Sequence, residues 1–122
     1  MSAFNWIIIN YRCPNCDDKK AEIRCQTHIA SSYAGINKRF HDETYNLGEK
    51  MQWWHFGHPD FDKWRVDGCI IPCENDPQFD RECCYSECLS CGAELYVVIR
   101  FKQNLPLEVL HVCSEWVENY YQ

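Results

Sequence analysis

Two Cys-x-x-Cys pairs constrain this chain more than any other feature of its sequence. Cys13-Pro-Asn-Cys16 lies near the N-terminus, and Cys88-Leu-Ser-Cys91 follows after residues 17–87. In a tight turn, two cysteines at this spacing present their sulfur atoms on one side. Structural zinc is bound by four such ligands in a tetrahedron. The sequence therefore predicts one zinc site that both pairs share.

The long separation of the pairs does not prevent them from sharing a metal ion. Closing a loop of ~71 residues instead of ~15 costs only about 1.4 kcal/mol more in chain entropy. Structural zinc contributes on the order of 10 kcal/mol in small peptides, so the metal term is the larger one. The alternatives are disulfides, a redox dithiol, or a pair that is simply buried cysteine. A thioredoxin-like dithiol would need a βαβ pattern around its pair, and none is visible.

The surroundings of both pairs point to a family. A polar or glycine-containing turn follows each pair, and a β-prone segment leaves the turn. Each pair thus resembles the zinc knuckle of the zinc-ribbon superfamily, in which two knuckles from different hairpins share one metal ion. The resemblance makes residues 6–28 and 84–112 the two halves of a ribbon and residues 30–83 a long insertion. Four thiolates leave no open coordination position, so this zinc would be structural.

The remaining pattern predicts a mainly β protein. Residues 5–12, 21–28 and 93–101 are β-prone, and in 21–28 apolar and polar residues alternate with the period of a half-buried strand. Residues 108–113 are the expected hairpin partner of 93–101, and short strands are expected at 49–56 and 66–71. Ser114 is a suitable cap for a short C-terminal helix. We expect a single domain over residues 1–122, a zinc-ribbon-like sheet with a long, irregular, aromatic-rich insertion.

Charge and cysteine content bear on the partner and the compartment. The chain has 18 acidic and 12 basic residues, a formal charge of -6, and four zinc-bound thiolates would make it more negative. This charge disfavours nucleic acid and suits a basic protein partner. The apolar run at residues 6–9 is too short for a signal peptide, and no apolar segment reaches membrane-spanning length. Ten cysteines in such a chain favour a reducing, cytoplasmic location.

Six cysteines remain outside the two pairs. Cys69-Ile-Ile-Pro-Cys73, together with Cys83 or Cys84, is a possible second metal site, which His55, His58 or Cys25 would complete. The alternative is that these residues are buried free cysteines, which behave as small hydrophobic side chains. Cys25 and Cys113 lie inside alternating segments and suit this alternative.

Residues 53–64 combine many aromatic side chains with two histidines. They can form the core of the insertion, a surface for a protein partner, or a catalytic site that uses His55 or His58. The sequence around these histidines lacks the glutamate and the spacing of the His-Glu-x-x-His metalloprotease helix. Trp, Tyr and Arg dominate interface hot spots. The candidate partner-binding residues are Trp53, Trp54, Phe56, Phe61 and Trp64, with Asp60 and Asp62 to meet positive charge.

These observations favour a non-enzymatic binding protein, in which a zinc-held β scaffold presents an acidic, aromatic insertion to a basic protein. In general character the chain is similar to the immunity proteins that neutralise bacterial toxins, which are commonly small, acidic and cytoplasmic. That resemblance implies inhibition of a toxin or an enzyme. The first alternative is a nucleic-acid or transcription-associated zinc ribbon. The second is a metal-dependent hydrolase that uses His55 and His58.

Overall fold

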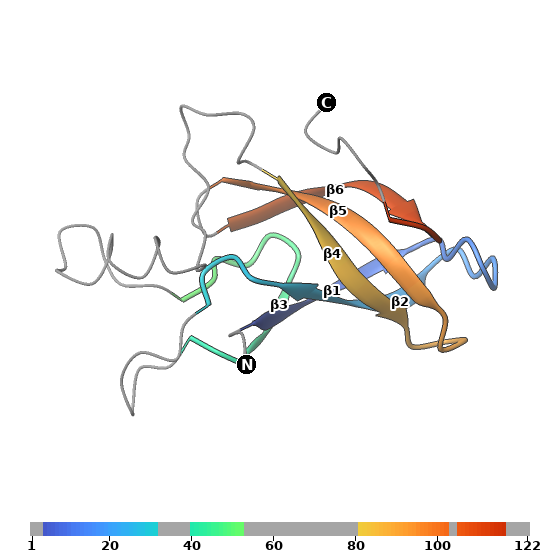
Figure 1. The fold of residues 1–122 in the computed structure, drawn as a ribbon, viewed down its shortest axis with the longest axis horizontal. Coiled ribbons are helices and arrows are strands. Elements are labelled where there is room, and N and C mark those ends of the chain that lie inside the picture. Colours follow the sequence, from blue (N-terminus) through green and yellow to red (C-terminus); the bar gives the residue numbers. More distant parts are fainter. Residues whose placement is uncertain (1–3, 32–39, 53–80, 103–104, 117–122) are drawn as a thin grey trace, which may run out of the picture.

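The protein is mainly β, which confirms the predicted fold class. The computed structural model describes residues 4–31, 40–52, 81–102 and 105–116, and within them there are six strands and no helix. All six belong to one sheet with the strand order β3-β1-β2-β4-β5-β6 (Figure 1). The strands are β1 Asn5–Tyr11, β2 Ala21–Thr27, β3 Thr44–Asn46, β4 Arg81–Cys88, β5 Glu94–Lys102 and β6 Leu105–Cys113.

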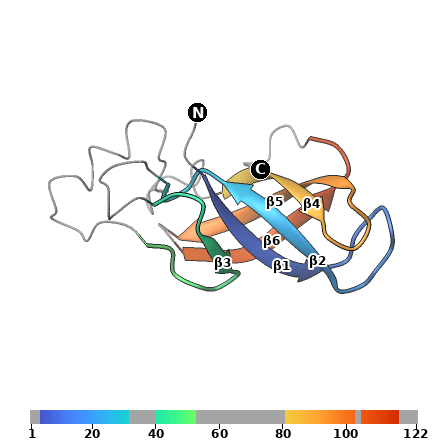
Figure 2. The ribbon, with the colours of Figure 1, turned by 90° about the horizontal axis from the view of Figure 1, so that it is seen from below.

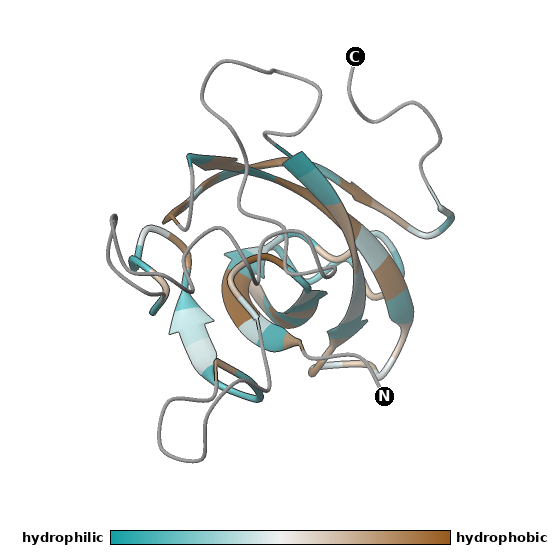
Figure 3. Cartoon of the chain, turned by 60° about the vertical axis from the view of Figure 1, so that its left-hand side comes forward, coloured by the Kyte–Doolittle hydropathy of each residue, from teal (hydrophilic) through white to brown (hydrophobic). Residues whose placement is uncertain are grey.

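The sheet curls around its own apolar face, as Figures 2 and 3 show. Neighbouring strands are antiparallel, except that β3 lies parallel to β1. The two edge strands approach each other, because the amide of Gly48, just after β3, donates to the carbonyl of Pro106 in β6 at 2.8 Å. Within the described residues, the curl of one sheet therefore encloses the interior.

Alternation along the strands fills that interior. On β2 the side chains of Ala21, Ile23, Cys25 and Thr27 are buried, and the residues between them are more exposed, as the period of two predicts. β1 alternates in the same way, β5 adds Leu95, Val97, Ile99 and Phe101 to the core, and Val109 and Val112 of β6 pack against it. The largest fully buried side chains are Phe101, Ile7, Ile9, Ile23, Met51, Leu95, Ile99, Val97 and Val98.

Strand β4 was not expected from the sequence, since residues 81–87 fall in a stretch without a clear pattern. Cys84, Ser86 and Cys88 are buried, whereas Tyr85 and Glu87 between them are exposed. The alternation is present, but cysteine and serine occupy the positions that aliphatic residues usually take. β4 is nevertheless central, because it joins β2 to β5.

Two smaller expectations are corrected. The strand expected at 49–56 is wrong over residues 49–52, and a short strand lies earlier, at Thr44–Asn46, where it pairs with β1. Ser114, Glu115 and Trp116 do not begin a helix. The rest of these segments, residues 53–56 and 117–122, and the strand expected at 66–71 lie outside the described residues. Within the described residues no helix has the length and hydrophobicity needed to span a membrane.

Candidate metal centre

The sheet topology brings the two Cys-x-x-Cys pairs to the same end of the molecule. The first pair lies in the turn from β1 to β2, and the second lies at the end of β4 and in the turn to β5. β2 and β4 are antiparallel partners, with Ile23 opposite Cys88. The amide of Leu89 also donates to the carbonyl of Glu22 at 2.9 Å. Pairing of these two strands therefore places the turns side by side (Figure 1).

The two turns have the same backbone geometry. The carbonyl of Cys13 accepts a hydrogen bond from the amide of Asp17 at 2.9 Å, and that of Cys88 accepts one from Gly92 at 2.7 Å. In each turn the amide of the first cysteine donates to the carbonyl five residues later, at 3.0 Å. Asp17 and Gly92 both adopt the left-handed conformation, with φ of 61° and 75°. The turns are therefore equivalent, as the two similar sequences predict.

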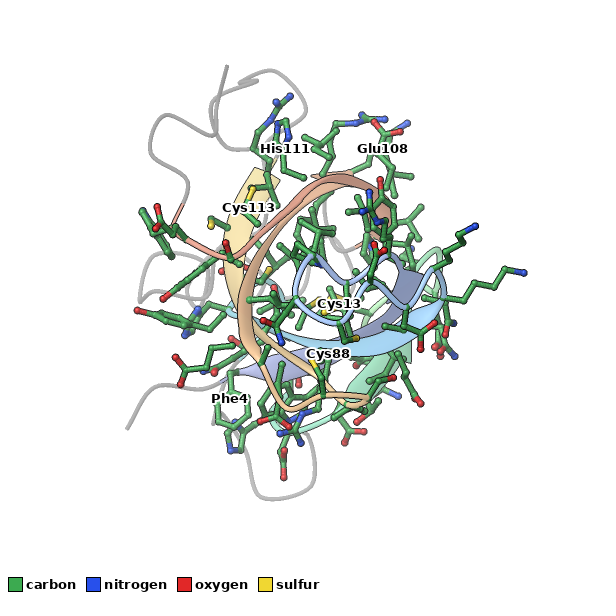
Figure 4. The ribbon with its side chains drawn as sticks, turned by 90° about the vertical axis from the view of Figure 1, so that its right-hand side faces the viewer. Phe4, Cys13, Cys88, Glu108, His111 and Cys113 are labelled. Carbon is green, nitrogen blue, oxygen red and sulfur yellow. The ribbon has the colours of Figure 1, made fainter. Side chains whose placement is uncertain are left out.

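The four sulfur atoms lie close enough together to bind one metal ion. The Sγ atoms of Cys13 and Cys91 are 3.8 Å apart, and those of Cys16 and Cys88 are 3.9 Å apart. All four lie within 4.8 Å of one another, and Figure 4 shows Cys13 beside Cys88. A zinc–sulfur distance of about 2.3 Å gives a tetrahedral edge of about 3.8 Å. The cluster fits a metal ion of this size, and its thiols form no disulfide.

Burial and hydrogen bonds suit charged sulfur atoms. Cys13 and Cys88 are buried, whereas Cys16 and Cys91 are exposed. The amides of Asn15 and Cys16 point at the Cys13 Sγ at 3.4 and 3.5 Å, and the Asn15 side-chain amide donates to the Cys91 Sγ at 3.4 Å. Hydrogen bonds to an ionised acceptor are stronger than neutral ones. These donors therefore stabilise thiolates in the two turns.

The two exposed thiols have opposite pKa shifts. The Asn15 side-chain amide is the main cause that lowers the pKa of Cys91 to about 6. A backbone hydrogen bond with Asp18 lowers the pKa of Cys16. However, desolvation and hydrogen bonds with the other three cysteines outweigh it and raise that pKa to about 12. Four simultaneous thiolates at these distances require a bound cation.

The other cysteines in the described part of the chain, Cys25, Cys83, Cys84 and Cys113, do not join this cluster. Among the described residues, the four cysteines of the two turns are the one group of three or more potential ligands close enough to hold a metal ion. Cys83 is buried on β4, while Cys69 and Cys73, with His55 and His58, lie outside the described residues. Burial raises the pKa of Cys25 to about 12 and that of Cys84 well above its usual value. Both are buried free thiols, and for Cys25 this agrees with the prediction of a cysteine that packs as a small hydrophobic side chain.

The candidate partner-binding residues of the insertion also fall outside the part of the chain that the structure describes. Their role stays a prediction. These residues are Trp53, Trp54, Phe56, Phe61, Trp64, Asp60 and Asp62.

Sequence reasoning missed Glu82, which joins β4 to the end of β2. Its carboxylate accepts hydrogen bonds from the Thr27 hydroxyl at 2.5 Å and from the His28 amide at 3.1 Å. It also lies 3.3 Å from Nδ1 of His28 and 3.5 Å from Sγ of Cys84. The signal in the sequence is a lone acidic residue beside two cysteines, which does not reveal partners more than fifty residues away.

Comparison of the chain with protein-family models, curated proteins and solved structures gives no match. The function must therefore be argued from the geometry of the chain itself.

Proposed function

We propose that this chain is a non-enzymatic zinc protein in which one Zn²⁺, bound by Cys13, Cys16, Cys88 and Cys91, holds the two turns of a curled β-sheet together. The observation that carries this proposal is the set of sulfur–sulfur distances, 3.8 and 3.9 Å, which equal the edge of a zinc–sulfur tetrahedron. Four thiolates fill the coordination sphere of the ion. Such an ion supports the fold and has no position for a substrate.

The proposed activity is binding to a basic protein, in the manner of an immunity protein that inhibits a toxin. A formal charge of -6 supports this class of partner, because it speeds encounter with a cationic surface. The aromatic and acidic residues at 53–64 support the same conclusion, since Trp side chains are frequent hot spots in interfaces. The zinc-ribbon resemblance supplies the scaffold in this proposal, and the insertion supplies the contact.

The metal half is tested by counting zinc in the reduced, purified protein by inductively coupled plasma mass spectrometry. We expect one zinc per chain. Cys13→Ser and Cys88→Ser should each lose it, because three ligands bind the ion much more weakly than four. Cys113→Ser is the matched control, since Cys113 lies on β6 and belongs to no ligand group of the described residues. Metal-free protein, or zinc that survives the Cys88→Ser change, would overturn this half.

The partner half is tested by co-expressing the tagged chain with the products of the genes beside its own. We expect one basic product to co-purify and to lose its activity in the complex. The double variant Trp53→Ala/Trp54→Ala should weaken that complex at least about tenfold. Tyr11→Ala, an exposed aromatic residue on β1, serves as the control. Equal affinity of the double variant and the control would remove the insertion from the interface.

A further inference from the structure

The outer face of the β4–β5 hairpin carries three aromatic rings in mutual contact. Tyr85 and Tyr96 are register partners, and their ring centroids are 5.3 Å apart. The ring of Trp116, beyond β6, lies 5.9 Å from Tyr85 and 5.7 Å from Tyr96. Even so, Tyr85 is 58% exposed and Trp116 is 47% exposed. Exposed aromatic rings that are already ordered lose little entropy when a partner covers them.

Two glutamates extend this aromatic group toward the metal centre. Glu87 and Glu94 are register partners two positions along from Tyr85 and Tyr96, so they lie on the same outer face. Both are exposed. Like charges directly opposite each other destabilise a sheet. Within the described structure neither carboxylate forms an ion pair. The pair is therefore a repulsive arrangement that a cation would relieve.

The basic residue that is paired with Glu87 on the sheet does not supply that cation. Arg24 of β2 is the register partner of Glu87. Its guanidinium carbon lies 4.1 Å from the centroid of the Trp6 ring, and among the described contacts no ion pair joins it to Glu87. The contact with Trp6 shows that this outer face accepts a guanidinium on an aromatic ring. Because Arg24 contacts Trp6 instead, the negative charges of Glu87 and Glu94 remain uncompensated.

We infer that this surface, the hairpin face, docks a segment of a basic protein through arginine side chains. The hairpin face consists of Tyr85, Glu87, Glu94, Tyr96 and Trp116. A guanidinium can stack on an exposed ring and form a bidentate pair with a neighbouring carboxylate, and here both groups stand side by side on two paired strands. Phosphate groups would be repelled by the same two carboxylates. The inference rests on the proposed function for the class of partner, but places the contact away from residues 53–64.

The metal centre and the hairpin face share one turn. Glu87 immediately precedes Cys88, and the amide of Cys88 donates to the carbonyl of Ala93, next to Glu94. A metal ion bound at Cys88 and Cys91 would fix the register that sets the two glutamates opposite each other. We therefore expect the docking to need the metal-loaded protein.

The test is a titration of the ¹⁵N-labelled, zinc-loaded chain with an acetylated, amidated nona-arginine peptide, followed by nuclear magnetic resonance. We expect the largest shift changes at amides of residues 85–87 and 94–96 and at the Trp116 indole. Tyr85→Ala/Trp116→Ala should weaken binding at least about tenfold. Glu87→Gln/Glu94→Gln, which keeps size and shape, should weaken it several-fold and reduce its salt dependence.

The matched controls make the same chemical changes elsewhere on the surface. Tyr11→Ala and Glu43→Gln each alter an exposed residue outside the hairpin face and should leave the affinity unchanged. If the double alanine variant fails to fold, the double glutamine variant decides the question. Shifts that map elsewhere, or an affinity that the glutamine variant retains in full, would overturn the inference.

Two further measurements distinguish a failure of this inference from a failure of the proposed function. Zinc is counted on the same sample, so a zinc-loaded chain without shifts at the hairpin face overturns the inference alone, whereas a zinc-free chain counts against the proposed function. A single-stranded oligothymidylate is titrated in parallel. Stronger binding of this oligonucleotide than of the peptide at the hairpin face would overturn the assignment of a basic protein as the partner.

Discussion

At the residue scale, the side chain of Glu82 contacts three residues, Thr27, His28 and Cys84. Its carboxylate satisfies the Thr27 hydroxyl and the His28 amide, and its side chain is only 16% exposed. Removal of one partner leaves buried donors without a hydrogen bond, and the free-energy cost of that is larger than the net gain from making the bond. The hydrogen bonds of this carboxylate therefore hold the end of β2 to β4.

We expect Glu82→Ala to lower the free energy of unfolding by about 2 kcal/mol, because two or more donors lose their acceptor. Chemical denaturation of the zinc-loaded protein measures the change. The control is Glu108→Ala, which removes the exposed ion pair with Arg100 at 2.8 Å. That change should cost less than about 1 kcal/mol. Equal losses in the two variants would contradict the assigned role.

The contact between His28 and Glu82 makes the stability of the fold depend on pH in a definite direction. A hydrogen bond to Glu82 is the main cause that raises the pKa of His28 in the folded protein, against partial desolvation. Protonated His28 therefore stabilises the fold fully below its unfolded pKa of about 6.5. That contribution disappears as the pH rises through the higher folded pKa.

We expect wild type to be more stable than His28→Gln at pH 5.5, and the difference to shrink above neutral pH. It should stay below about 1 kcal/mol, because the His28 side chain is 40% exposed and solvent screens the pair. Denaturation of both proteins at each pH measures it, and the comparison cancels the pH dependence of zinc binding. A difference that grows with pH would show that the sign is wrong.

At the scale of elements, the metal-binding turns depend on residues in the left-handed conformation. Gly92 has φ of +75°, and a Cβ added there would meet nothing within 4 Å. An alanine at this position is therefore strained by its backbone alone, at a cost of about 1 kcal/mol. The equivalent position in the first turn is Asp17, a residue type that tolerates this conformation better than most.

Gly92→Ala should speed the transfer of zinc to a chromophoric chelator about fivefold, the equivalent of about 1 kcal/mol. Gly48→Ala is the matched control. Gly48 has φ of +86° and equally open surroundings, but it lies in the turn after β3 and outside the metal centre. The control should lower stability by a similar amount and leave the transfer rate unchanged. The same acceleration in both variants would contradict a local effect on the metal.

The sequence was most informative where an element has a local signature. Strands β1, β2 and β5 could be predicted because their residues are β-prone, and in β2 also because apolar and polar residues alternate. The ligand turns could be predicted because the two cysteines of each pair lie three positions apart. Strand β4 could not be predicted, because Cys84 and Ser86 occupy its buried positions and cysteine shows no clear preference for strands. The role of Glu82 could not be predicted either, because its partners Thr27 and His28 become neighbours only when β2 pairs with β4.

At the scale of the whole molecule, a metal ion bound by the four cysteines would stabilise the same arrangement as strand pairing does. The two turns are far apart in the chain, and β2–β4 pairing brings them together, with a hydrogen bond from the Asn15 side-chain amide to Cys91 Sγ between them. In the absence of metal, the thiols of the cluster repel one another once they ionise. The free energy of metal binding is therefore folding free energy for this sheet.

Treatment of the protein with a strong chelator should lower the free energy of unfolding by several kcal/mol, because structural zinc contributes on the order of 10 kcal/mol in small peptides. Thermal denaturation followed by far-ultraviolet circular dichroism measures the loss, and added zinc should restore the original transition. The Cys13→Ser variant should unfold at the same temperature with and without chelator. An unchanged transition in wild type would show that the sheet is stable without the ion.

The placement of the ligands on both sides of the β2–β4 contact also sets an order of events. A growing polypeptide that has emerged only as far as β2 offers two sulfur ligands, and the other two arrive with the end of β4 and its turn. Full coordination is thus possible only after a late segment has found an early one. Uptake of the ion would then report that assembly has reached the fourth strand, and fragments that stop earlier would remain open to proteolysis.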